Sequence, residues 1–414
     1  MMHGSKFTLP FRNLLRRPGR TAIILSGICA GVVAILLAGG FIEWIFWAMR
    51  ESTILYRTGH IQVVRPGYLD HGSADPFSYL LPEHSGELEA IERNPEIKAV
   101  SPKLFFSGLI SRGESTVSFI GEGVDPEREE AFDPQASIRK GERLAAARPN
   151  GIILGVGLAQ TLGVVPGDRV VLLANTAAGG FNGVEADVSG LFTTSNKEFD
   201  DVVIRTPLPM ARQLLRVSGS HAWVILLKGT LHEQSHTSAA IETLRKSSIG
   251  GGVAFEFVPW YSLADFYKKS VSLLSRQMDV VRIIIAVIII LGISNVLIMS
   301  VLDRTSEIGT LKALGLRCRD ILRLFLMESA ILGLLGGLLG VGVGCALGEA
   351  LSFVGIPMPP APGMDIGYTA KILISWQLVA GSWLLAFSTT LVAGIYPAWK
   401  ASRLEIVDAL RHGR

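Results

Sequence analysis

Four stretches of this chain are apolar over about 20 residues each, the length that an α-helix needs to cross the hydrocarbon core of a bilayer. Charged residues make up 18% of the chain, against about a quarter in ordinary soluble domains, which argues against a disordered chain and against a cytosolic enzyme. A cleaved signal peptide is the alternative for the first stretch, but its apolar run exceeds the usual ~7–15 residues. The four stretches are residues 21–42, 280–302, 324–347 and 376–399.

The distribution of Lys and Arg beside these stretches predicts how the chain crosses the membrane, because short cytoplasmic segments are enriched in basic residues. The loop 349–375 carries one basic residue, Lys371. Basic residues gather before the first stretch, between the second and third, and after the fourth: Lys6, Arg12, Arg16, Arg17, Arg20, Arg304, Lys312, Arg317, Arg319, Arg323, Lys400, Arg403, Arg411 and Arg414. We therefore expect both termini and the 303–323 loop in the cytoplasm, and the region 50–275 and the 349–375 loop outside it.

These patterns predict a membrane protein with four transmembrane helices and a large mixed α/β extracytoplasmic domain between the first and second. The expected order is a cytoplasmic amphipathic basic segment (1–20), a first span (21–49), the extracytoplasmic domain (50–275), a stalk and second span (276–302), a cytoplasmic loop (303–323), a third span (324–348), an outer loop (349–375), a fourth span (376–399) and a cytoplasmic tail (400–414).

The extracytoplasmic region alternates strand and helix patterns. Strand–helix–strand order recurs at 60–110 and 223–258, which predicts two small lobes with an inserted β-rich piece at about 150–218. A Gly-rich turn at 179–183 separates two apolar runs and predicts a hairpin. A helix is expected from Leu263 directly into the second span. The expected strands are 60–65, 103–110, 117–121, 168–174, 184–192, 201–204, 223–228 and 253–258, and the expected helices are 84–93, 154–162, 207–216 and 233–247.

Glycine recurs every four residues along the third span, which predicts close packing of another helix on that face. The stripe consists of Gly336, Gly340, Gly344 and Gly348. Polar side chains lie in or beside the spans, where ionisable groups are by default candidates for function, a proton relay among them. These are Glu43, Asn295, Glu328 and Glu349, and a location near span ends, in reach of headgroups or water, is the favoured interpretation for the three glutamates.

The 303–315 segment is a short amphipathic stretch that ends at a glycine. One interpretation is a helix that docks into a groove of a soluble partner. The other is an interfacial helix that lies on lipid headgroups. The residues themselves leave both open.

An alternative of another class, a membrane-anchored zinc protease, rests on residues 232–236, which match H-E-x-x-H. His232 and His236 would bind zinc and Glu233 would act as base. An exposed helix start is the favoured interpretation, because no third ligand is evident. No phosphate-binding loop and no catalytic triad is legible in the sequence, and a net charge of +3 gives no reason to expect nucleic acid as a partner.

Four motifs in order resemble the FtsX/MacB/LolC-type permeases of ABC transporters (type VII, mechanotransmission). The basic start matches their R-N-L-x-R entry, and 303–315 is similar to their R-x-x-E-I-G-x-L-K-A-L-G loop. The segment before the glycine-rich span and the tail after Tyr396 are similar to the same family. These motifs are Phe11–Thr21, Asp303–Gly315, Met327–Ala330 and Tyr396–Arg411.

The resemblance implies a bacterial inner-membrane subunit with a MacB-like periplasmic core, no enzyme by itself and without a cofactor of its own. ATP and Mg²⁺ would be bound by a separate ABC ATPase dimer, and a second permease copy or a paralogue would complete the membrane part. The segment that contacts the ATPase is called the coupling helix. Its residues here would be Arg304, Glu307, Ile308, Gly309, Lys312, Ala313, Leu314 and Gly315.

The family leaves the cargo open. Extraction of lipoprotein or lipophilic substrate from the outer leaflet is the leading expectation, and efflux of small molecules or peptides with a periplasmic adaptor and an outer-membrane channel is the alternative. Signalling to a cell-wall hydrolase fits less well, because the extracytoplasmic domain is large. Trp44, Phe46 and Trp47 are candidates for receiving an acyl chain, although an ordinary aromatic belt is the favoured interpretation of these residues.

Overall fold

The computed structural model describes residues 18–72, 74–132, 137–194, 197–228, 234–247, 254–359 and 367–403. The chain divides into two compact units. The helical unit comprises Met1–Trp47, Ser270–Pro357 and Thr369–Arg414, and the α/β unit comprises Ala48–Lys269 and Met358–Tyr368.

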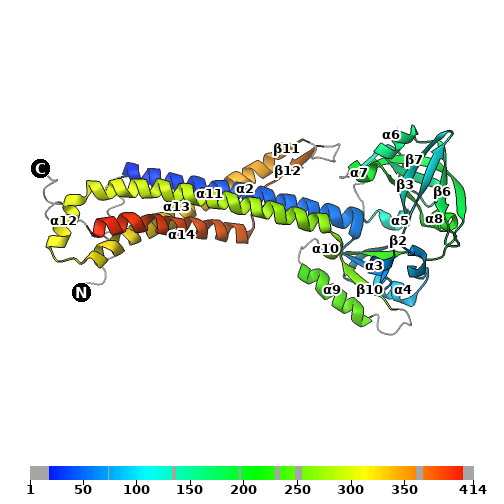
Figure 1. Ribbon diagram of the computed structural model, residues 1–414, viewed down its shortest axis with the longest axis horizontal. Coiled ribbons are helices and arrows are strands. Elements are labelled where there is room, and N and C mark those ends of the chain that lie inside the picture. Colours follow the sequence, from blue (N-terminus) through cyan, green and yellow to red (C-terminus); the bar gives the residue numbers. More distant parts are fainter. Residues whose placement is uncertain are drawn as a thin grey trace. The chain divides into compact units, whose positions relative to one another are not determined.

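Four helices of the described residues are long and apolar enough to cross a membrane. They are α2 (Pro18–Thr53), α11 (Asp265–Asp303), α13 (Cys318–Val354) and α14 (Trp376–Ser402) (Figure 1). The helix expected to begin at Leu263 begins at Asp265 and continues through the second span without a break, after the short α10 (Trp260–Leu263). The helices extend beyond the apolar stretches because a helix satisfies its own backbone hydrogen bonds in water as well as in lipid.

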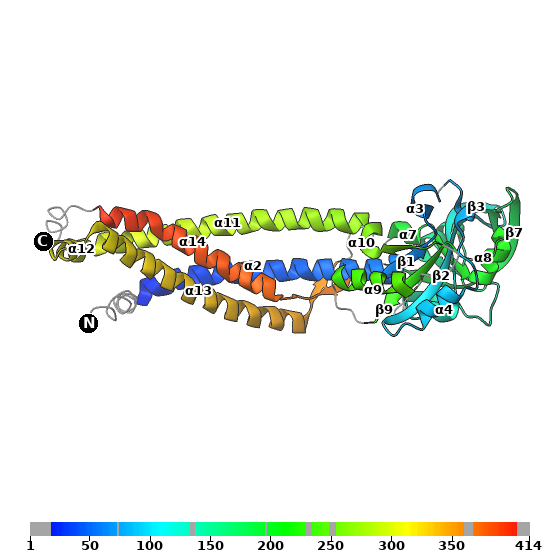
Figure 2. The same ribbon diagram turned by 90° about the horizontal axis from the view of Figure 1, so that it is seen from below.

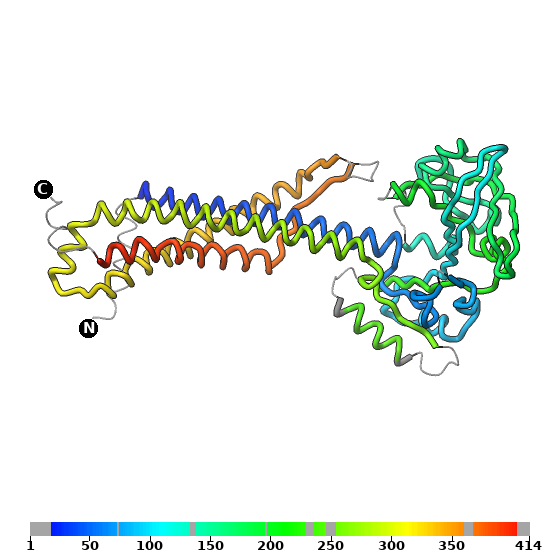
Figure 3. The backbone as a smooth tube through the Cα atoms, in the orientation of Figure 1, coloured from blue at the N-terminus to red at the C-terminus, as the bar shows by residue number. Residues whose placement is uncertain are grey.

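Short elements connect these helices. The nine-residue helix α12 (Thr305–Ala313) lies between α11 and α13, where Figure 3 shows the yellow part of the chain turning. Two three-residue strands, β11 (Ile356–Met358) and β12 (Tyr368–Ala370), pair between α13 and α14. A π-helical turn, η1 (Ile54–Thr58), follows α2 and ends at Gly59, whose φ of +62° suits glycine.

The glycine stripe of α13 packs against α2 (Figure 2). A Cβ added at Gly336, Gly340 or Gly344 would lie 2.9, 2.6 or 2.7 Å from a side-chain atom of α2. The α2 residues that they meet have the same four-residue spacing: Ile28, Val32 and Leu36. The fourth residue of the stripe, Gly348, lies against Ile374. Absence of side chains therefore lets two helix backbones approach, which is how helices associate in lipid.

The α/β unit is built on a ten-stranded mixed sheet with the order β10-β1-β9-β2-β3-β8-β5-β7-β4, in which β6 pairs with β2 and β7. The strands are β1 (Ile61–Val64), β2 (Ile97–Arg112), β3 (Ser115–Val124), β4 (Ser137–Gly141), β5 (Gly151–Gly155), β6 (Arg169–Asn175), β7 (Phe181–Thr193), β8 (Val203–Pro207), β9 (Ala222–Leu227) and β10 (Glu256–Pro259). The helices are α3 (Tyr68–His71), η2 (Pro76–Tyr79), α4 (Gly86–Glu92), α5 (Pro126–Glu129), α6 (Val156–Leu162), α7 (Lys197–Asp200), α8 (Leu208–Leu215) and α9 (Gln234–Ser247).

The long strand β2 passes through two lobes of this unit. Its first half pairs with β9, and its second half pairs with β3 and β6. Lobe A contains β1, β9, β10, α4 and α9 around a core that includes Trp223 and Ile225. Lobe B contains β3, β5 to β8, α6 and α8 around a second core that includes Leu154 and Leu172. Each core side chain that is fully buried contributes roughly 1.5–3 kcal/mol.

The expected arrangement of lobes requires a correction. The two strand–helix–strand units at 60–110 and 223–258 pair with each other in lobe A, because β1 lies between β9 and β10 and β9 pairs with β2. The β-rich piece accordingly begins near residue 104 and not at 150. Joining the two units gives β1 and β9 a partner on both sides and leaves β10 as the edge strand.

The predicted hairpin is confirmed, since β6 and β7 pair in antiparallel register from Arg169 opposite Asp187 to Asn175 opposite Phe181. The helix expected over 154–162 begins at Val156, because the preceding residues form the buried strand β5 between β7 and β8. A short apolar run such as 151–155 does not by itself distinguish a buried strand from the start of a helix.

Candidate functional site

The α12 segment has one buried face and one exposed face. Ile308 is 3% exposed and packs in an apolar cluster with residues of α11, α13 and α14, and Gly309 is buried beside it. The residues from the other helices are Val301, Ile321, Phe325, Ala398 and Ala401. On the opposite face Glu307, Thr310 and Ala313 are exposed.

An ion pair attaches the start of α12 to α13. Arg304, the residue before the first turn, places its Nη1 3.4 Å from Oε1 and 3.5 Å from Oε2 of Glu328. The two side chains are only 10% and 4% exposed. A buried charge that loses its partner is strongly destabilising, so this contact fixes α12 relative to α13.

Leu314 follows the last turn of α12 and is 75% exposed. The chain then turns at Gly315 with φ +97°, and Asp320 Oδ2 accepts a hydrogen bond from the backbone N–H of Arg317 at 3.1 Å, which begins α13. A large apolar side chain at the tip of a fixed turn is the arrangement by which a short helix enters a groove of another protein.

The residues expected to form the coupling helix thus divide between two environments. Glu307, Ala313, Leu314 and Gly315 are exposed, and Lys312 is half-buried. Arg304, Ile308 and Gly309 are buried within this chain. Composition alone does not separate the two groups, because packing against α11, α13 and α14 decides which face of α12 is buried.

The aromatic candidates on α2 do not form one surface. Trp44 is 9% exposed, whereas Trp47 is 38% exposed, and Phe46 is half-buried. Trp44 and Trp47 are three positions apart and share one side of the helix, but of the three aromatic residues Trp47 alone is well exposed.

The candidate zinc ligands His232 and Glu233 lie outside the described residues. His236, in the first turn of α9, is exposed. Among the residues that the structure does describe, no group of three metal-ligating side chains comes together.

A charged cluster that the sequence analysis missed lies inside the α/β unit. Lys103 Nζ is 3.1 Å from Glu129 Oε1, and Arg205 Nε is 3.0 Å from Glu122 Oε2. Burial alone would raise the pKa of Glu129, but the charges of Lys103 and Arg205 outweigh it and lower that pKa. The charges are balanced and their residues come from β2, β3, β8 and α5, so we interpret the cluster as a structural link.

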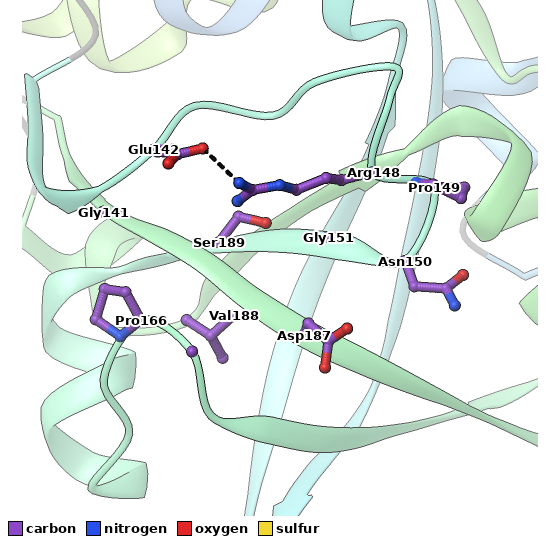
Figure 4. Close-up of a pocket in the computed structure, with 11 residues that line it drawn as sticks. Gly141, Glu142, Arg148, Pro149, Asn150, Gly151, Pro166, Asp187, Val188 and Ser189 are labelled. Atoms are coloured by element: carbon purple, nitrogen blue, oxygen red, sulfur yellow. Dashed lines mark ion pairs between the residues drawn. The ribbon is translucent and has the colours of Figure 1, made fainter.

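A shallow cavity of about 560 Å³ lies in lobe B, among β5, β7 and the loop before β5 (Figure 4). Arg148 and Glu142 form an ion pair of 3.0 Å at its rim, and both are more than half exposed. Asp187 and Asn150 also line it. Among the described residues its walls hold neither a histidine nor a cysteine, and they show no nucleophile paired with a base.

Two family models match the chain. The model described as MacB-like periplasmic core domain matches residues 21–246, which is more than half of the chain. The model described as FtsX-like permease C-terminal matches residues 280–406, which include α12, α13 and α14.

Curated relatives cover most of the chain. It is 25% identical over 342 residues to the lipoprotein-releasing system transmembrane protein LolC of Xylella fastidiosa, with 77% of this chain and 79% of that protein covered. It is 28% identical over 427 residues to the macrolide export ATP-binding/permease protein MacB of Rhodospirillum rubrum, with 98% of this chain but only 60% of that protein covered.

A solved structure of the periplasmic region of MacB from Actinobacillus actinomycetemcomitans covers 51% of this chain and 94% of its own, with 12% identity and a TM-score of 0.37. The assignment to a family therefore depends on the two family models.

Proposed function

Since this chain belongs to the FtsX/MacB/LolC family of ABC transporter permeases, we propose that it couples ATP hydrolysis by a separate ATPase to motion of its α/β unit. Permease subunits of this family are not enzymes themselves. ATP and Mg²⁺ would bind to the ATPase and not to this chain. In this proposal both termini and α12 lie in the cytoplasm of a bacterial inner membrane, and a second permease copy or a paralogue completes the transporter.

The observation that carries the proposal is the two-sided environment of α12. Its inner face is fixed by Ile308 and by the ion pair of Arg304 with Glu328, while Leu314 is exposed at its tip. A helix that is fixed on one side can transmit force from a partner bound on the other. The exposed residues would contact the ATPase, and the buried residues would position them.

For the cargo we propose a lipoprotein or another lipophilic molecule extracted from the outer leaflet. The relative named as a lipoprotein-releasing protein supports this choice, because the match spans most of that protein. The match of nearly the whole chain to a macrolide export protein favours efflux as the second candidate. Identification of the cargo separates the two.

The test is affinity purification of the tagged chain from its native membrane, followed by mass spectrometry of the proteins that elute with it. We expect an ABC ATPase with the wild-type chain and its loss with Leu314→Asp. The matched control is Phe181→Asp in β7, because Phe181 is also a large apolar side chain and is 82% exposed, but in the α/β unit. That variant should retain the ATPase.

Two results would contradict the proposal. One is the absence of any ATPase from the wild-type sample under gentle solubilisation. The other is equal recovery of the ATPase with Leu314→Asp. Elemental analysis of the same sample for zinc tests the protease alternative, which requires about one bound ion per chain.

A further inference from the structure

A second cavity, of about 510 Å³, lies in the helical unit between the end of α13 and the start of α14. Glu349 and Ser352 line it from α13, and Trp376 and Val379 line it from α14. Ile372 and Ile374, in the segment just before α14, supply apolar walls. The cavity takes no part in the proposed contact with an ATPase, which lies at the other end of α13.

The depth of this cavity in the membrane follows from the positions of the charged residues along α13. The 20 residues between Glu328 and Glu349 include no charged side chain. At a rise of 1.5 Å per residue, the two glutamates are about 31 Å apart along the helix, which matches the thickness of the hydrocarbon core of a bilayer. Trp376 begins α14, and tryptophan is enriched at the interface with the headgroups. Glu349 and Trp376 therefore lie at the headgroup level opposite the α12 loop.

The hydroxyl groups at the cavity already have partners. Ser352 Oγ accepts a hydrogen bond from the backbone N–H of Ile372 at 2.8 Å and donates one to its carbonyl at 3.0 Å. Ser375 Oγ donates to Glu43 Oε1 at 2.8 Å and accepts from the backbone N–H of Leu378 at 3.1 Å. These bonds hold the 372–375 segment in place, so the apolar walls are part of a formed cavity.

Glu349 differs from the two serines, because its exposed side chain lies at the cavity without any hydrogen bond or ion pair among the residues described. No Lys, Arg or His of the described chain lines the cavity. Trp376 is 80% exposed beside it. A carboxylate next to an indole attracts an ammonium group, the carboxylate through its charge and the indole through its π-face.

We propose that this cavity binds the headgroup of an aminophospholipid from the surrounding bilayer. The ammonium group lies between the Glu349 carboxylate and the Trp376 indole, and the first carbons of an acyl chain lie against Ile372, Ile374 and Val379. The occupant is a bilayer lipid because the cavity is at headgroup level and its lining combines a carboxylate and an indole with the apolar side chains of Ile372, Ile374 and Val379. This site goes beyond the proposed function and does not depend on an ATPase.

The test is native mass spectrometry of the purified full chain, titrated in a mild detergent with dioleoyl phosphatidylethanolamine or dioleoyl phosphatidylglycerol. We expect tighter binding of phosphatidylethanolamine, and about fivefold weaker binding of it by Glu349→Gln, which corresponds to one partly exposed charge contact. Trp376→Leu should weaken the same binding by about threefold. Neither variant should weaken the binding of phosphatidylglycerol, which has no ammonium group and whose negative charge the Glu349 carboxylate repels.

The matched control is Glu185→Gln, which removes an exposed carboxylate of β7 in the α/β unit and should leave both affinities unchanged. Equal affinities of the wild-type chain for the two lipids would overturn the proposal. So would unaltered binding of phosphatidylethanolamine by Glu349→Gln. A third lipid, N-acetyl phosphatidylethanolamine, lacks the ammonium but retains the rest of the headgroup. If it bound as well as phosphatidylethanolamine, the proposal would fail.

Discussion

The buried ion pair between Arg304 and Glu328 gives the sharpest prediction about the α12 segment. Glu328→Gln removes the negative charge while keeping the shape of the side chain, and leaves a guanidinium that is 10% exposed beside a neutral amide. Loss of one partner of a buried pair costs roughly 3–5 kcal/mol. The N–O distances of 3.4 and 3.5 Å are long for a charged hydrogen bond, so we expect the lower end, about 3 kcal/mol.

The assay is a double-mutant cycle, with the free energy of unfolding of the purified chain measured in mixed detergent micelles. We expect Arg304→Met to cost about 3 kcal/mol as well, because it leaves the carboxylate buried alone. The double variant, with Glu328→Met, should cost less than either single change, since two apolar side chains of similar volume need no partners. If Glu328→Gln costs under about 0.5 kcal/mol, or if the double variant costs as much as the sum of Arg304→Met and Glu328→Met measured singly, the pair does not fix α12.

The same variants also test the role of this pair in coupling. If the pair positions α12, each single change should lower the permease-dependent ATPase activity of the reconstituted complex. This loss is expected even where the amount of bound ATPase is unchanged. Leu314→Asp should instead reduce the amount bound.

Three further predictions concern packing and charge. Gly340→Ala should destabilise the helical unit by roughly 1–3 kcal/mol, because its Cβ would lie 2.6 Å from a side-chain atom of α2, whereas Gly342→Ala, with no atom within 4 Å, should change unfolding by under about 1 kcal/mol. Burial lowers the pKa of His221 to about 4 from 6.5, so its contribution to stability is complete above pH 6.5 and is lost as the pH falls towards 4. Between pH 7 and 4.5, His221→Gln should therefore lose roughly 2 kcal/mol less unfolding free energy than the wild type, and equal losses would refute this assignment. Glu129→Gln should cost about 3 kcal/mol in chemical denaturation, and addition of Lys103→Met should recover part of it; no recovery would show that the charges are not coupled.

The local patterns of the sequence predicted the individual elements well. The hairpin β6–β7 was readable because a Gly-rich turn and two alternating runs are adjacent in the chain. The strand β5 was missed because its five buried residues owe their conformation to β7 and β8, which lie 30 to 50 residues further along the chain. The arrangement of lobe A was predicted incorrectly for the same reason, since its strands come from both ends of the α/β unit.

For the candidate site, too, the sequence predicted the segment but not which of its side chains are buried. The sequence identified the 303–315 segment through its motif, but it did not distinguish Ile308, which is buried, from Leu314, which is exposed. Nor did it indicate that Arg304 and Glu328, which are 24 positions apart, form a buried pair.

By itself the sequence determined the four membrane-crossing helices, their order and the place of the large domain, because the transfer of about 20 apolar residues into lipid depends on local composition alone. It also determined which helix face carries the glycines, since that depends only on a period of 3.6 residues. Only the tertiary structure decided that this face meets Ile28, Val32 and Leu36 of α2, and which face of α12 is left for a partner. Those outcomes depend on the shapes of side chains that come together from different helices, where packing and not hydropathy selects the neighbour.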